Sequence, residues 1–296
     1  MHKIVIYLMN KKGLEVLNKI IEKYSSQIIE HVVLSKDLTV KNDYYDEIMR
    51  VCIEQRLKYF IKDEDIPNFE GYKFAVGWRW IIADYKKLIV LHDSILPKYR
   101  GFSPLVNMLI NGEKEIGVTA LFAEQDYDKG KIISQSKIAI QYPVKIAQAI
   151  EIISKLYQET ICDVIDKIQN DIMIEGILQN ESIATYSVWR DEDDYYIDWT
   201  KDSAFIKRCV DALGFPFNGA RTKIKDDIII VDEVEIIKDV EIENRDVGVG
   251  KVIFFQDGYP VIICGKGLLK IIKARTNDGE HFLSIMKFRT KFGGNR

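Results

Sequence analysis

The sequence predicts an α/β protein: a mostly parallel sheet with helices on both faces, followed by a smaller β-rich domain. Two observations carry this prediction. In the first half of the chain, short runs of β-branched residues alternate with longer amphipathic stretches, which is typical of parallel strands joined by helices. In the second half, short apolar runs follow one another closely with glycine turns between them, which is typical of a small barrel.

The elements of the first half follow from the spacing of apolar residues. In the longest predicted helix, Ile146, Ile150 and Ile153 recur at helical spacing, so one face of it should pack on the sheet. The predicted strands are 3–9, 28–34, 72–77, 88–91, 117–123 and 131–140, and the predicted helices are 13–24, 44–57, 104–110 and 144–168.

An aromatic and acidic stretch at 179–202 separates the two halves. The chain of 296 residues is long enough for two cores. We therefore expect an N-terminal domain at 1–184, a linker at 185–204 and a C-terminal domain at 205–296. The C-terminal part should contain a helix at 203–213 and strands such as 228–231, 252–255 and 261–264.

Composition narrows the function classes. A net charge of −3 removes the global basic field on which nucleic-acid binding depends, so nucleic acid is disfavoured as a partner. No stretch reaches the roughly 18 to 20 apolar residues of a membrane span, and Met1-His2-Lys3 leads directly into a strand. The four cysteines and four histidines are scattered, which predicts buried thiols, a reducing compartment and no metal site. We expect a cytoplasmic protein with no membrane partner.

A histidine at the end of a predicted strand is the first candidate catalytic residue. The apolar run 88–91 delivers His92 to the carboxyl edge of the sheet, where doubly wound folds bind ligands. Taken alone, such a histidine is more often structural. The loop that follows, with Ser94, Arg100 and Gly101, is rich in polar groups and turn formers and favours a chemical role.

An acidic loop after the strand 117–123 is the second candidate. If this strand lies beside the strand that ends at His92, Asp128 comes near the imidazole and can orient it. Glu124 and Asp126 are weaker candidates from the same loop. An Asp-x-Gly sequence such as 128–130 is by itself a common turn.

Two groups of motifs carry a family resemblance. One is His92-x-Ser94-x-Leu96-Pro97-x-x-Arg100-Gly101-x-x-Pro104 with Gly112, Gly117-x-Thr119 and Asp128-x-Gly130; the other is Ile197-Asp198-Trp199 with Phe215-Pro216-Phe217-Asn218-Gly219-Ala220. The first resembles the formyltransferase family, which includes methionyl-tRNA formyltransferases, glycinamide ribonucleotide transformylases and sugar N-formyltransferases. The second is similar to the linker and OB-like C-terminal domain of the tRNA and sugar branches.

The resemblance implies a Rossmann-like formyltransferase domain, an OB-like β-barrel, and transfer of a formyl group from N10-formyltetrahydrofolate to a primary amine without a metal. It implies that His92 relays the proton of the amine, with Asp128 orienting the ring and Ser94 as a further catalytic candidate. The family commonly has an asparagine two residues before the histidine, where this chain has Val90. Protonated His92, a backbone N–H, Ser94 or an ordered water are the open substitutes for that donor.

The resemblance also implies where the folate binds. Backbone groups of 80–82 and of the loop 121–128 can read the donors and acceptors along one edge of a pteridine. The alternative is that the tryptophans pack the core. The candidate cofactor-binding residues are Trp78, Trp80, Ile81, Ile82, Phe122, Glu124 and Asp126.

The expected acceptor is a nucleotide-linked amino sugar, a UDP- or dTDP-linked 4-amino-4,6-dideoxyhexose used in cell-surface glycan biosynthesis. The slight acidity of the chain and the short loop at 98–104 disfavour tRNA. The open alternatives are a methionyl-tRNA or carrier-bound aminoacyl formyltransferase, a formyltetrahydrofolate hydrolase, and a non-catalytic folate or nucleotide-sugar binding protein. A structural role or a homodimer interface is expected of the C-terminal domain. The candidate substrate-binding residues are Lys11, Lys98, Tyr99, Arg100, Trp189 and Arg190.

Overall fold

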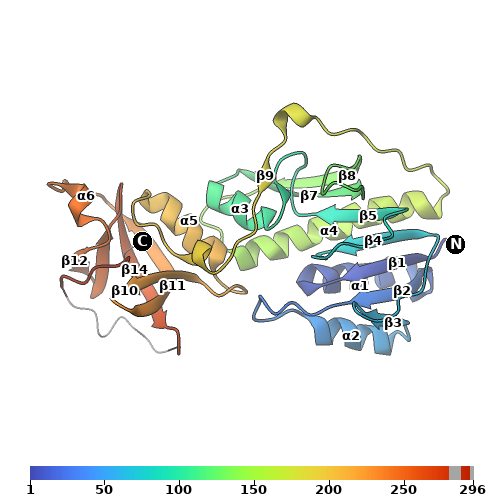
Figure 1. The fold of residues 1–296 in the computed structure, drawn as a ribbon, viewed down its shortest axis with the longest axis horizontal. Helices are drawn as coiled ribbons and strands as arrows, with labels where there is room; N and C mark the ends of the chain where they lie inside the picture. Colours follow the sequence, from blue (N-terminus) through green and yellow to red (C-terminus); the bar gives the residue numbers. More distant parts are fainter. Residues whose placement is uncertain (280–287, 294–296) are drawn as a thin grey trace. The chain divides into compact units, whose positions relative to one another are not determined.

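The computed structural model describes residues 1–279 and 288–293, so parts of the predicted C-terminal domain, 280–287 and 294–296, lie outside the described residues. The chain forms two compact units (Figure 1). The first comprises 1–107, 114–140 and 148–189, and the second comprises 108–113, 141–147 and 190–296. Two short pieces of the first half of the chain therefore belong to the second unit.

A seven-stranded sheet forms the centre of the first unit, in the order β3-β2-β1-β4-β5-β7-β8. The first five of these are parallel, whereas β7 is antiparallel to both β5 and β8, which confirms the predicted mostly parallel sheet. The strands are β1 (Ile4–Leu8), β2 (Ile29–Leu34), β3 (Tyr59–Ile61), β4 (Tyr72–Val76), β5 (Leu88–His92), β7 (Glu115–Phe122) and β8 (Ile132–Ala139).

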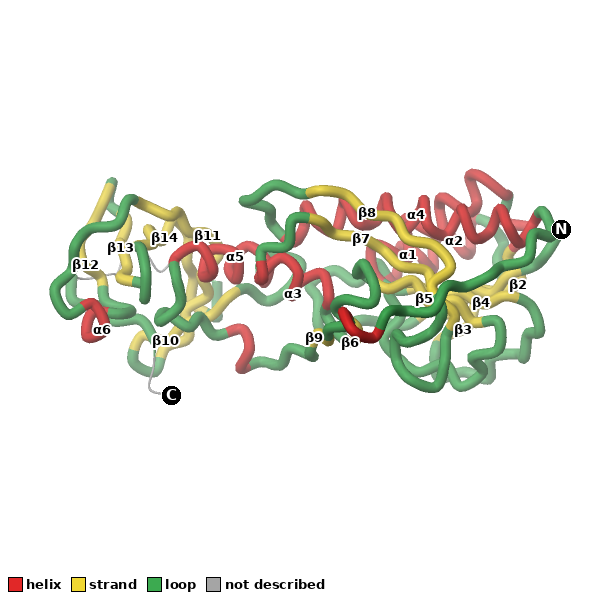
Figure 2. The backbone as a smooth tube through the Cα atoms, turned by 90° about the horizontal axis from the view of Figure 1, so that it is seen from above, coloured by secondary structure: helices red, strands yellow, loops and turns green. Residues whose placement is uncertain are grey.

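Three helices cover one face of this sheet: α1 (Asn10–Tyr24), α2 (Tyr45–Glu54) and α4 (Ile146–Gln169). The crossovers through α1 and α2 step in the same direction across the sheet, so right-handed connections place both helices on one face. Tyr24 of α1 donates a hydrogen bond of 2.7 Å to Asp166, which holds α4 on that face as well. Figure 2 shows the three helices together on one side of the strands.

On the opposite face the sequence pattern predicts helices, but the two connections on either side of β4 contain none. Two connections cross this face, 62–71 between β3 and β4 and 77–87 between β4 and β5. Side chains of both connections, among them Ile66 and Trp78, pack against Val5, Tyr7 and Val33 of the sheet. We call this the helix-free face.

His92 points to the helix-free face. Val5 lies beside Lys73, and Lys73 lies beside Leu88, so these three side chains are on one side of the sheet. Because side chains alternate along a strand, Val90 and His92 follow Leu88 on that side. The end of β5 therefore delivers the candidate histidine to the side of the sheet that the two connections cross.

The second unit is built on a separate five-stranded antiparallel sheet, in the order β10-β11-β14-β13-β12. Its strands are β10 (Ala220–Ile224), β11 (Asp227–Ile237), β12 (Val252–Gln256), β13 (Tyr259–Ile263) and β14 (Leu268–Thr276). The helix α5 (Ser203–Leu213) is capped by Asp202, which accepts a hydrogen bond of 2.8 Å from the backbone of Phe205.

The remaining elements are short: α3 (Pro104–Asn111), α6 (Arg245–Gly248), the strands β6 (Arg100–Gly101) and β9 (Tyr186–Ser187), and the 3₁₀ turns Ser26–Ile28, Glu181–Ile183 and Asp193–Tyr195. Strands β6 and β9 pair with each other, in parallel. Among the described residues, no helix combines the length and the apolar character needed to cross a membrane.

Candidate active site

His92 is buried, with 7% of its surface exposed, and both of its ring nitrogens have defined surroundings. Nε2 lies 2.8 Å from the backbone oxygen of Tyr99. Because a carbonyl can only accept, Nε2 must carry a proton, and the neutral ring then has its lone pair on Nδ1. Nδ1 lies 3.5 Å from Oδ1 of Asp128. The basic nitrogen of the imidazole therefore faces a carboxylate.

Asp128 is held by the loop that follows His92. Its Oδ2 accepts a hydrogen bond of 2.8 Å from the backbone N–H of Gly101. Its backbone is left-handed, with φ of 55°, a conformation that aspartate tolerates better than most residues. The structure thus brings together the two residues that the motif paired, although 35 residues of chain separate them in sequence order.

Gly130 makes this loop geometry possible. A Cβ atom built on Gly130 would lie 1.7 Å from the carbonyl oxygen of Phe122, a distance that no side chain can occupy. The Asp-x-Gly sequence is thus more than a generic turn at this place. The glycine lets the backbone fold close against the end of β7 and brings Asp128 back toward β5.

Replacing Gly130 by alanine is expected to displace this loop. The clash with backbone cannot be relieved by a side-chain rotation, so we expect a loss of about 1–3 kcal/mol of stability. Thermal unfolding of Gly130→Ala would measure it. The matched control is Gly214→Ala, where an added Cβ would meet its nearest atom at 3.5 Å and φ is not positive. Equal melting temperatures for the two variants would contradict the packing argument.

Gln179, which was not predicted from the sequence, connects the loop that carries Asp128 to Arg100. Its Nε2 donates to the backbone oxygens of Asp128 at 2.7 Å and Gly130 at 2.8 Å. Its Oε1 accepts from the Arg100 guanidinium at 2.8 and 3.1 Å. No local motif marks this glutamine, because its partners come from segments about 50 and 80 residues earlier in the chain.

Arg100, which the sequence predicts to bind substrate, is held by protein groups in this structure. Its side chain is fully buried and makes hydrogen bonds to Gln179, Glu181 and Tyr186. These five bonds match the five N–H donors of a guanidinium, so none is left for a diphosphate. The hydrogen bonds to Glu181 also raise the pKa of Arg100. These hydrogen bonds attach β6 to the segment that contains β9, which explains the position of Arg100 in the motif.

Replacing Arg100 by methionine should therefore act on stability more than on substrate affinity. We expect a loss of about 1–3 kcal/mol, measured by denaturant unfolding, because charge-assisted bonds to Gln179 and Glu181 disappear. The matched control is Lys98→Met, at an exposed position in the same loop. A strong rise of KM for a nucleotide substrate with unchanged stability in Arg100→Met would instead restore the original expectation.

Ser94, a predicted catalytic residue, holds the loop after His92 in this structure. Its fully buried hydroxyl donates a hydrogen bond of 2.7 Å to the backbone oxygen of Lys98, and its own backbone oxygen accepts from Thr119 at 2.7 Å. Thr119 lies opposite His92 in the β5–β7 pair. These bonds fix the turn after His92 and leave the hydroxyl aimed at the backbone.

A second buried network, also missed from sequence, lies next to His92. Asp93 accepts hydrogen bonds from Lys12 of α1 and from Tyr157 of α4. Tyr157 also donates to the backbone oxygen of Leu91 at 3.1 Å. Burial alone would raise the pKa of Asp93, but the charge and hydrogen bond of Lys12 lower it below the usual range. The network ties the carboxyl end of β5 to two helices.

A formyl transferase family model matches residues 75–171, and the model of the formyl transferase C-terminal domain matches residues 190–287. Together they cover about two thirds of the sequence, and the first contains His92, Asp128 and the loop between them. The chain belongs to the formyltransferase family.

Curated relatives in this family are named methionyl-tRNA formyltransferase. The protein from Borrelia hermsii is 27% identical over 209 residues, which are 70% of this chain and 65% of that protein. The protein from Geobacter metallireducens is 30% identical over 202 residues, 68% of this chain and 61% of that protein. The matched part of this formyltransferase-family chain thus spans less than two thirds of the length of these relatives.

Solved structures share the fold over most of the chain. WlaRD, a sugar 3N-formyl transferase crystallised with dTDP and 5-N-formyl-THF, superposes with a TM-score of 0.69 at 20% identity, covering 94% of this chain and 98% of that one. An N-formyltransferase from Helicobacter canadensis, in complex with folinic acid and dTDP-3-aminofucose, gives 0.67 at 18% identity, covering 95% and 100%. At such identities the likeness establishes the formyltransferase fold alone.

In the loop expected to bind folate, two side chains pack on the core, whereas the backbone groups of 80–82 make no hydrogen bond within the described residues. Trp78 and Ile82 pack against the core of the helix-free face, as the structural alternative predicts for the tryptophans. Trp80 is 37% exposed and Ile81 is 74% exposed. Within the described part of the chain, no hydrogen bond uses the backbone groups of Trp80, Ile81 or Ile82. These groups are available to a ligand.

The other cofactor candidates follow β7. Phe122 is half-buried, and its backbone N–H donates to Lys131 at 3.0 Å. Glu124 is exposed, and Asp126 is exposed with its carboxylate paired to Lys129 at 2.9 Å. Phe122 is the last residue of β7, and Glu124 and Asp126 belong to the same β7–β8 connection as Asp128.

The substrate candidates other than Arg100 are dispersed. Lys11 pairs with Glu151 of α4, and Lys98 is exposed. The backbone N–H of Tyr99 donates to Thr185 at 2.9 Å, beside its carbonyl contact with His92. Trp189, 47% exposed, is the last residue of the first unit, and Arg190 is the first residue of the longest segment of the second unit.

A polar cluster at the carboxyl edge of β1, β2 and β4 was not expected from sequence. Buried Asp37 accepts hydrogen bonds from Asn10 at 3.0 Å and from Thr39 and Arg79. Burial alone would raise the pKa of Asp37, but these bonds and the Arg79 charge lower it. The Arg79 guanidinium lies 4.6 Å from the centre of the Trp189 ring. Arg79 thus fixes a tryptophan that sequence reasoning assigned to the substrate.

Proposed function

We propose that this protein is an N-formyltransferase that uses N10-formyltetrahydrofolate. The observation that carries the proposal is the His92–Asp128 pair, set by family motifs at the carboxyl end of β5 with the basic nitrogen facing the carboxylate. In its family this pair serves formyl transfer. The half-buried Val90 lies on the same side of the sheet as His92, so an aliphatic wall borders the proposed reaction centre.

The residues present fit a folate. A pteridine presents a row of donors and acceptors, and the unpaired backbone groups of 80–82 provide complementary ones without a charged side chain. When bound, N10-formyltetrahydrofolate supplies the formyl group. Trp78 and Ile82, anchored in the core of the helix-free face, hold this loop in place from behind.

In the proposed mechanism His92 moves the proton. A primary amine that attacks the formyl carbon must lose a proton, and Nδ1 of His92 is the basic atom that can take it. The Tyr99 carbonyl keeps the other proton on Nε2 and fixes the ring plane. Protonation makes both nitrogens donors, and the Asp128 carboxylate stabilises the resulting cation.

For the acceptor we propose an amine on a nucleotide-linked sugar, with the UDP- or dTDP-linked 4-amino-4,6-dideoxyhexose as first candidate. The net charge of −3 supports a small substrate over tRNA, whose binding depends on basic surface. The two structural neighbours with nucleotide in their crystals, WlaRD and the Helicobacter canadensis protein, add support for this branch. The names of the curated relatives favour methionyl-tRNA as the second candidate acceptor.

The test is turnover with a panel of acceptors. The purified chain is mixed with N10-formyltetrahydrofolate and with dTDP- and UDP-linked 3-amino or 4-amino sugars or methionyl-tRNA, while tetrahydrofolate release and product mass are followed. A nucleotide sugar that gains one formyl group is the expected product. Formylation of methionyl-tRNA alone would assign the second acceptor.

Hydrolysis of formyltetrahydrofolate should be measured separately. The reason is that this chain has Val90 where the family commonly has an asparagine, so the amide donor is absent. Release of formate at the same rate with and without acceptor would contradict formyl transfer and assign a hydrolase. Binding of folate with no release of tetrahydrofolate would assign a non-catalytic binding protein.

A further inference from the structure

A shielded lysine–aspartate pair lies directly behind His92. Asp93 follows His92 in the chain, so its side chain points to the other face of the sheet, where α1 and α4 lie. Its carboxylate accepts a hydrogen bond from Lys12, in the first turn of α1. The two side chains are only 13% and 16% exposed. Water and salt therefore screen the charges of this pair weakly, and they act on their neighbours.

Tyr157 of α4 holds this pair in place. It is buried, and its hydroxyl donates to Asp93 and to the backbone oxygen of Leu91 at 3.1 Å. Burial and the charge of Asp93 raise the pKa of Tyr157, so the hydroxyl keeps its proton and remains a donor. The ammonium of Lys12 lies 5.4 Å from the centre of the Tyr157 ring. Contacts from two helices thus fix the position of the Asp93 carboxylate.

The charges around His92 come from several elements and partly cancel. Asp128, in the β7–β8 connection, faces Nδ1 at 3.5 Å, and Nε2 faces a backbone carbonyl. Strand β7 places the uncharged Thr119 opposite His92. Asp93 brings a second carboxylate to the end of β5, and the ammonium of Lys12 balances it. The imidazole is therefore next to one uncompensated negative charge instead of two.

This balance matters for a general base, which must be free of its proton before the reaction and must hold one afterwards. An additional uncompensated carboxylate would keep the imidazole protonated, and an uncompensated ammonium would make it a weaker base. Burial alone would raise the pKa of Asp93, but Lys12 lowers it, and the charge of a protonated His92 acts in the same direction. Such coupling is reciprocal, so the Asp93 carboxylate in turn stabilises the protonated ring.

We propose that Asp93 is a positioning residue for proton transfer: its charge, balanced by Lys12 and held in place by Tyr157, sets how readily His92 takes up a proton. The inference rests on the proposed formyl transfer, in which His92 accepts the proton of the attacking amine. The effect of Asp93 on the imidazole needs no substrate, so it can be measured on the free protein.

The first experiment follows the imidazole signals of the four histidines of the full chain by NMR as the pH is changed. The His92 signal is assigned from its loss in His92→Asn. Asp93→Asn keeps an oxygen that can accept from Tyr157, but it removes the negative charge and leaves the ammonium of Lys12 uncompensated. His92 is expected to titrate about one pH unit lower in this variant. An unchanged titration would overturn the proposal.

Two further variants separate charge from structure. The double variant Lys12→Met with Asp93→Asn removes both charges, so the titration of His92 should return toward that of the unchanged protein. A merely structural role predicts no return, because the double variant lacks the same ion pair. Lys12→Met alone leaves the carboxylate uncompensated, so the His92–Asp93 pair should take up its proton at higher pH. A double variant that titrates like Asp93→Asn, or a shift to lower pH in Lys12→Met, would contradict the proposal.

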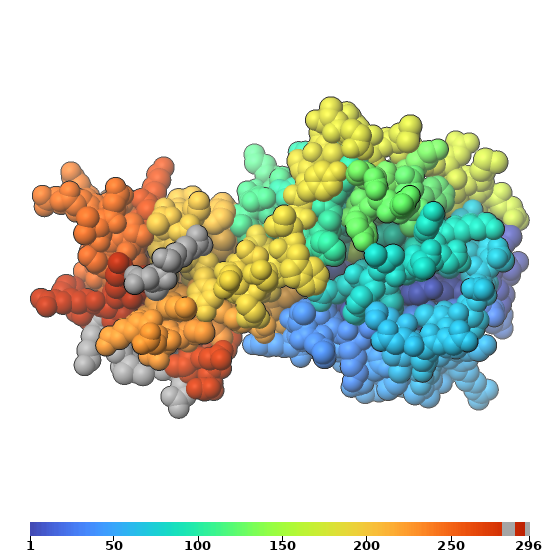
Figure 3. Space-filling view, viewed as in Figure 1, coloured from blue at the N-terminus to red at the C-terminus, as the bar shows by residue number. Residues whose placement is uncertain are grey.

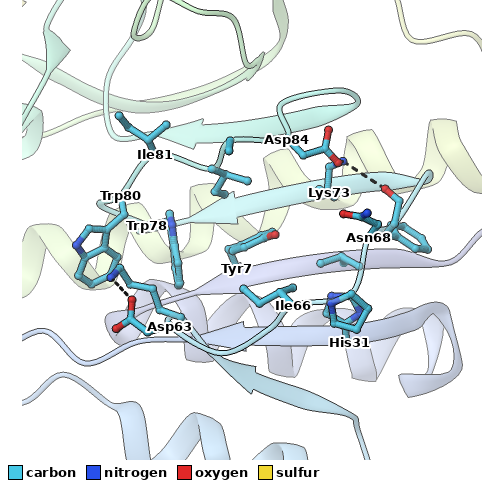
Figure 4. Close-up of a pocket in the computed structure, with 16 residues that line it drawn as sticks. Tyr7, His31, Asp63, Ile66, Asn68, Lys73, Trp78, Trp80, Ile81 and Asp84 are labelled. Atoms are coloured by element: carbon cyan, nitrogen blue, oxygen red, sulfur yellow. Dashed lines mark hydrogen bonds and ion pairs between the residues drawn. The ribbon is translucent and has the colours of Figure 1, made fainter.

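The matched control is a second lysine–carboxylate pair on the helix-free face. A pocket of about 370 Å³ hollows this face, and Lys73 and Asp84 line one end of it (Figure 4). Figure 3 shows the hollow, with the dark blue atoms of the N-terminal strand at its bottom. Buried Lys73 bonds to Asp84 at 2.6 Å and lies beside Leu88, at the start of β5. About 13 Å of strand, at roughly 3.3 Å per residue, separates it from His92.

Asp84→Asn leaves a buried lysine uncompensated, as Asp93→Asn does, but far from the imidazole. The titration of His92 should therefore stay where it is in the unchanged protein. A shift as large as that of Asp93→Asn would show that the imidazole responds to any change of charge in the domain, and the specific role of Asp93 would be lost.

Kinetics then connect the imidazole to the reaction. The acidic limb of the pH profile of kcat/KM for tetrahydrofolate release reports the base of the free enzyme. It should move to lower pH in Asp93→Asn by the same amount as the NMR titration, and return in the double variant. An imidazole that shifts in a protein without turnover would support the role of Asp93 and reject formyl transfer. Turnover with an imidazole that does not shift would reject the role of Asp93 alone.

Discussion

Replacing His92 by asparagine is expected to lower kcat for formyl transfer by about 10²–10⁴-fold, the usual contribution of a positioned general base. Asparagine keeps a polar amide near the position of Nδ1 at the end of β5, but it is too short to replace the bond from Nε2 to the carbonyl of Tyr99. It has no basic nitrogen to replace Nδ1. The measurement is tetrahydrofolate release at saturating folate and acceptor, with KM expected to change little because the lost interaction acts on proton transfer.

The control for this variant is His2→Asn, at an exposed histidine near the N-terminus that pairs with Asp171. It should turn over at the rate of the unchanged protein. Melting temperatures of both variants separate a loss of chemistry from a loss of fold. A folded His92→Asn protein with a near-normal kcat would show that His92 is not the general base.

Replacing Asp128 by asparagine should lower kcat by about 10²–10⁴-fold as well, through the same proton transfer. The asparagine carbonyl can still accept from the backbone of Gly101, so the loop should keep its shape. What disappears is the negative charge 3.5 Å from Nδ1 that stabilises the protonated imidazole. The effect should therefore appear in kcat more than in the free energy of unfolding.

Asp46→Asn, at an exposed aspartate in the first turn of α2, is the control for the charge change. The double variant His92→Asn with Asp128→Asn adds a sharper test. Because the two residues act as a unit, the double variant should be about as slow as the slower single variant. Losses that multiply would show that Asp128 acts independently of His92.

Much of the N-terminal fold was predictable because its elements bury one face each. The strand patterns that end at His92 and precede Asp128 appear where the sequence predicts them, within two residues at each end. The three-residue β3 and the C-terminal strands β10 and β14 were not predicted. Strand β3 is too short for a repeat to develop, and β10 mixes buried and charged residues with little apolar excess.

The predictability of the site differed from residue to residue. His92 and Asp128 were found because motif spacing and strand ends coincide. Arg100 has an equally clear motif position, yet its five hydrogen bonds point into the protein. Gln179 has no motif at all, because its role depends on a long loop returning to Asp128, and long-range contacts leave no periodic signal in the chain.

Hydrophobic period and motif spacing are local properties, so they were enough to predict the class of fold, the strand end that carries His92, and the family. Which polar groups are satisfied is visible only in the folded structure. In the folded structure, Ser94 donates to a backbone oxygen and Arg100 donates to neighbouring side chains. Nε2 of His31 and Nε1 of Trp78, beside a pocket, have no partner among the described residues. The physical reason is that hydrogen bonding of a buried group depends on every segment that packs around it, and these segments meet only when the chain has folded.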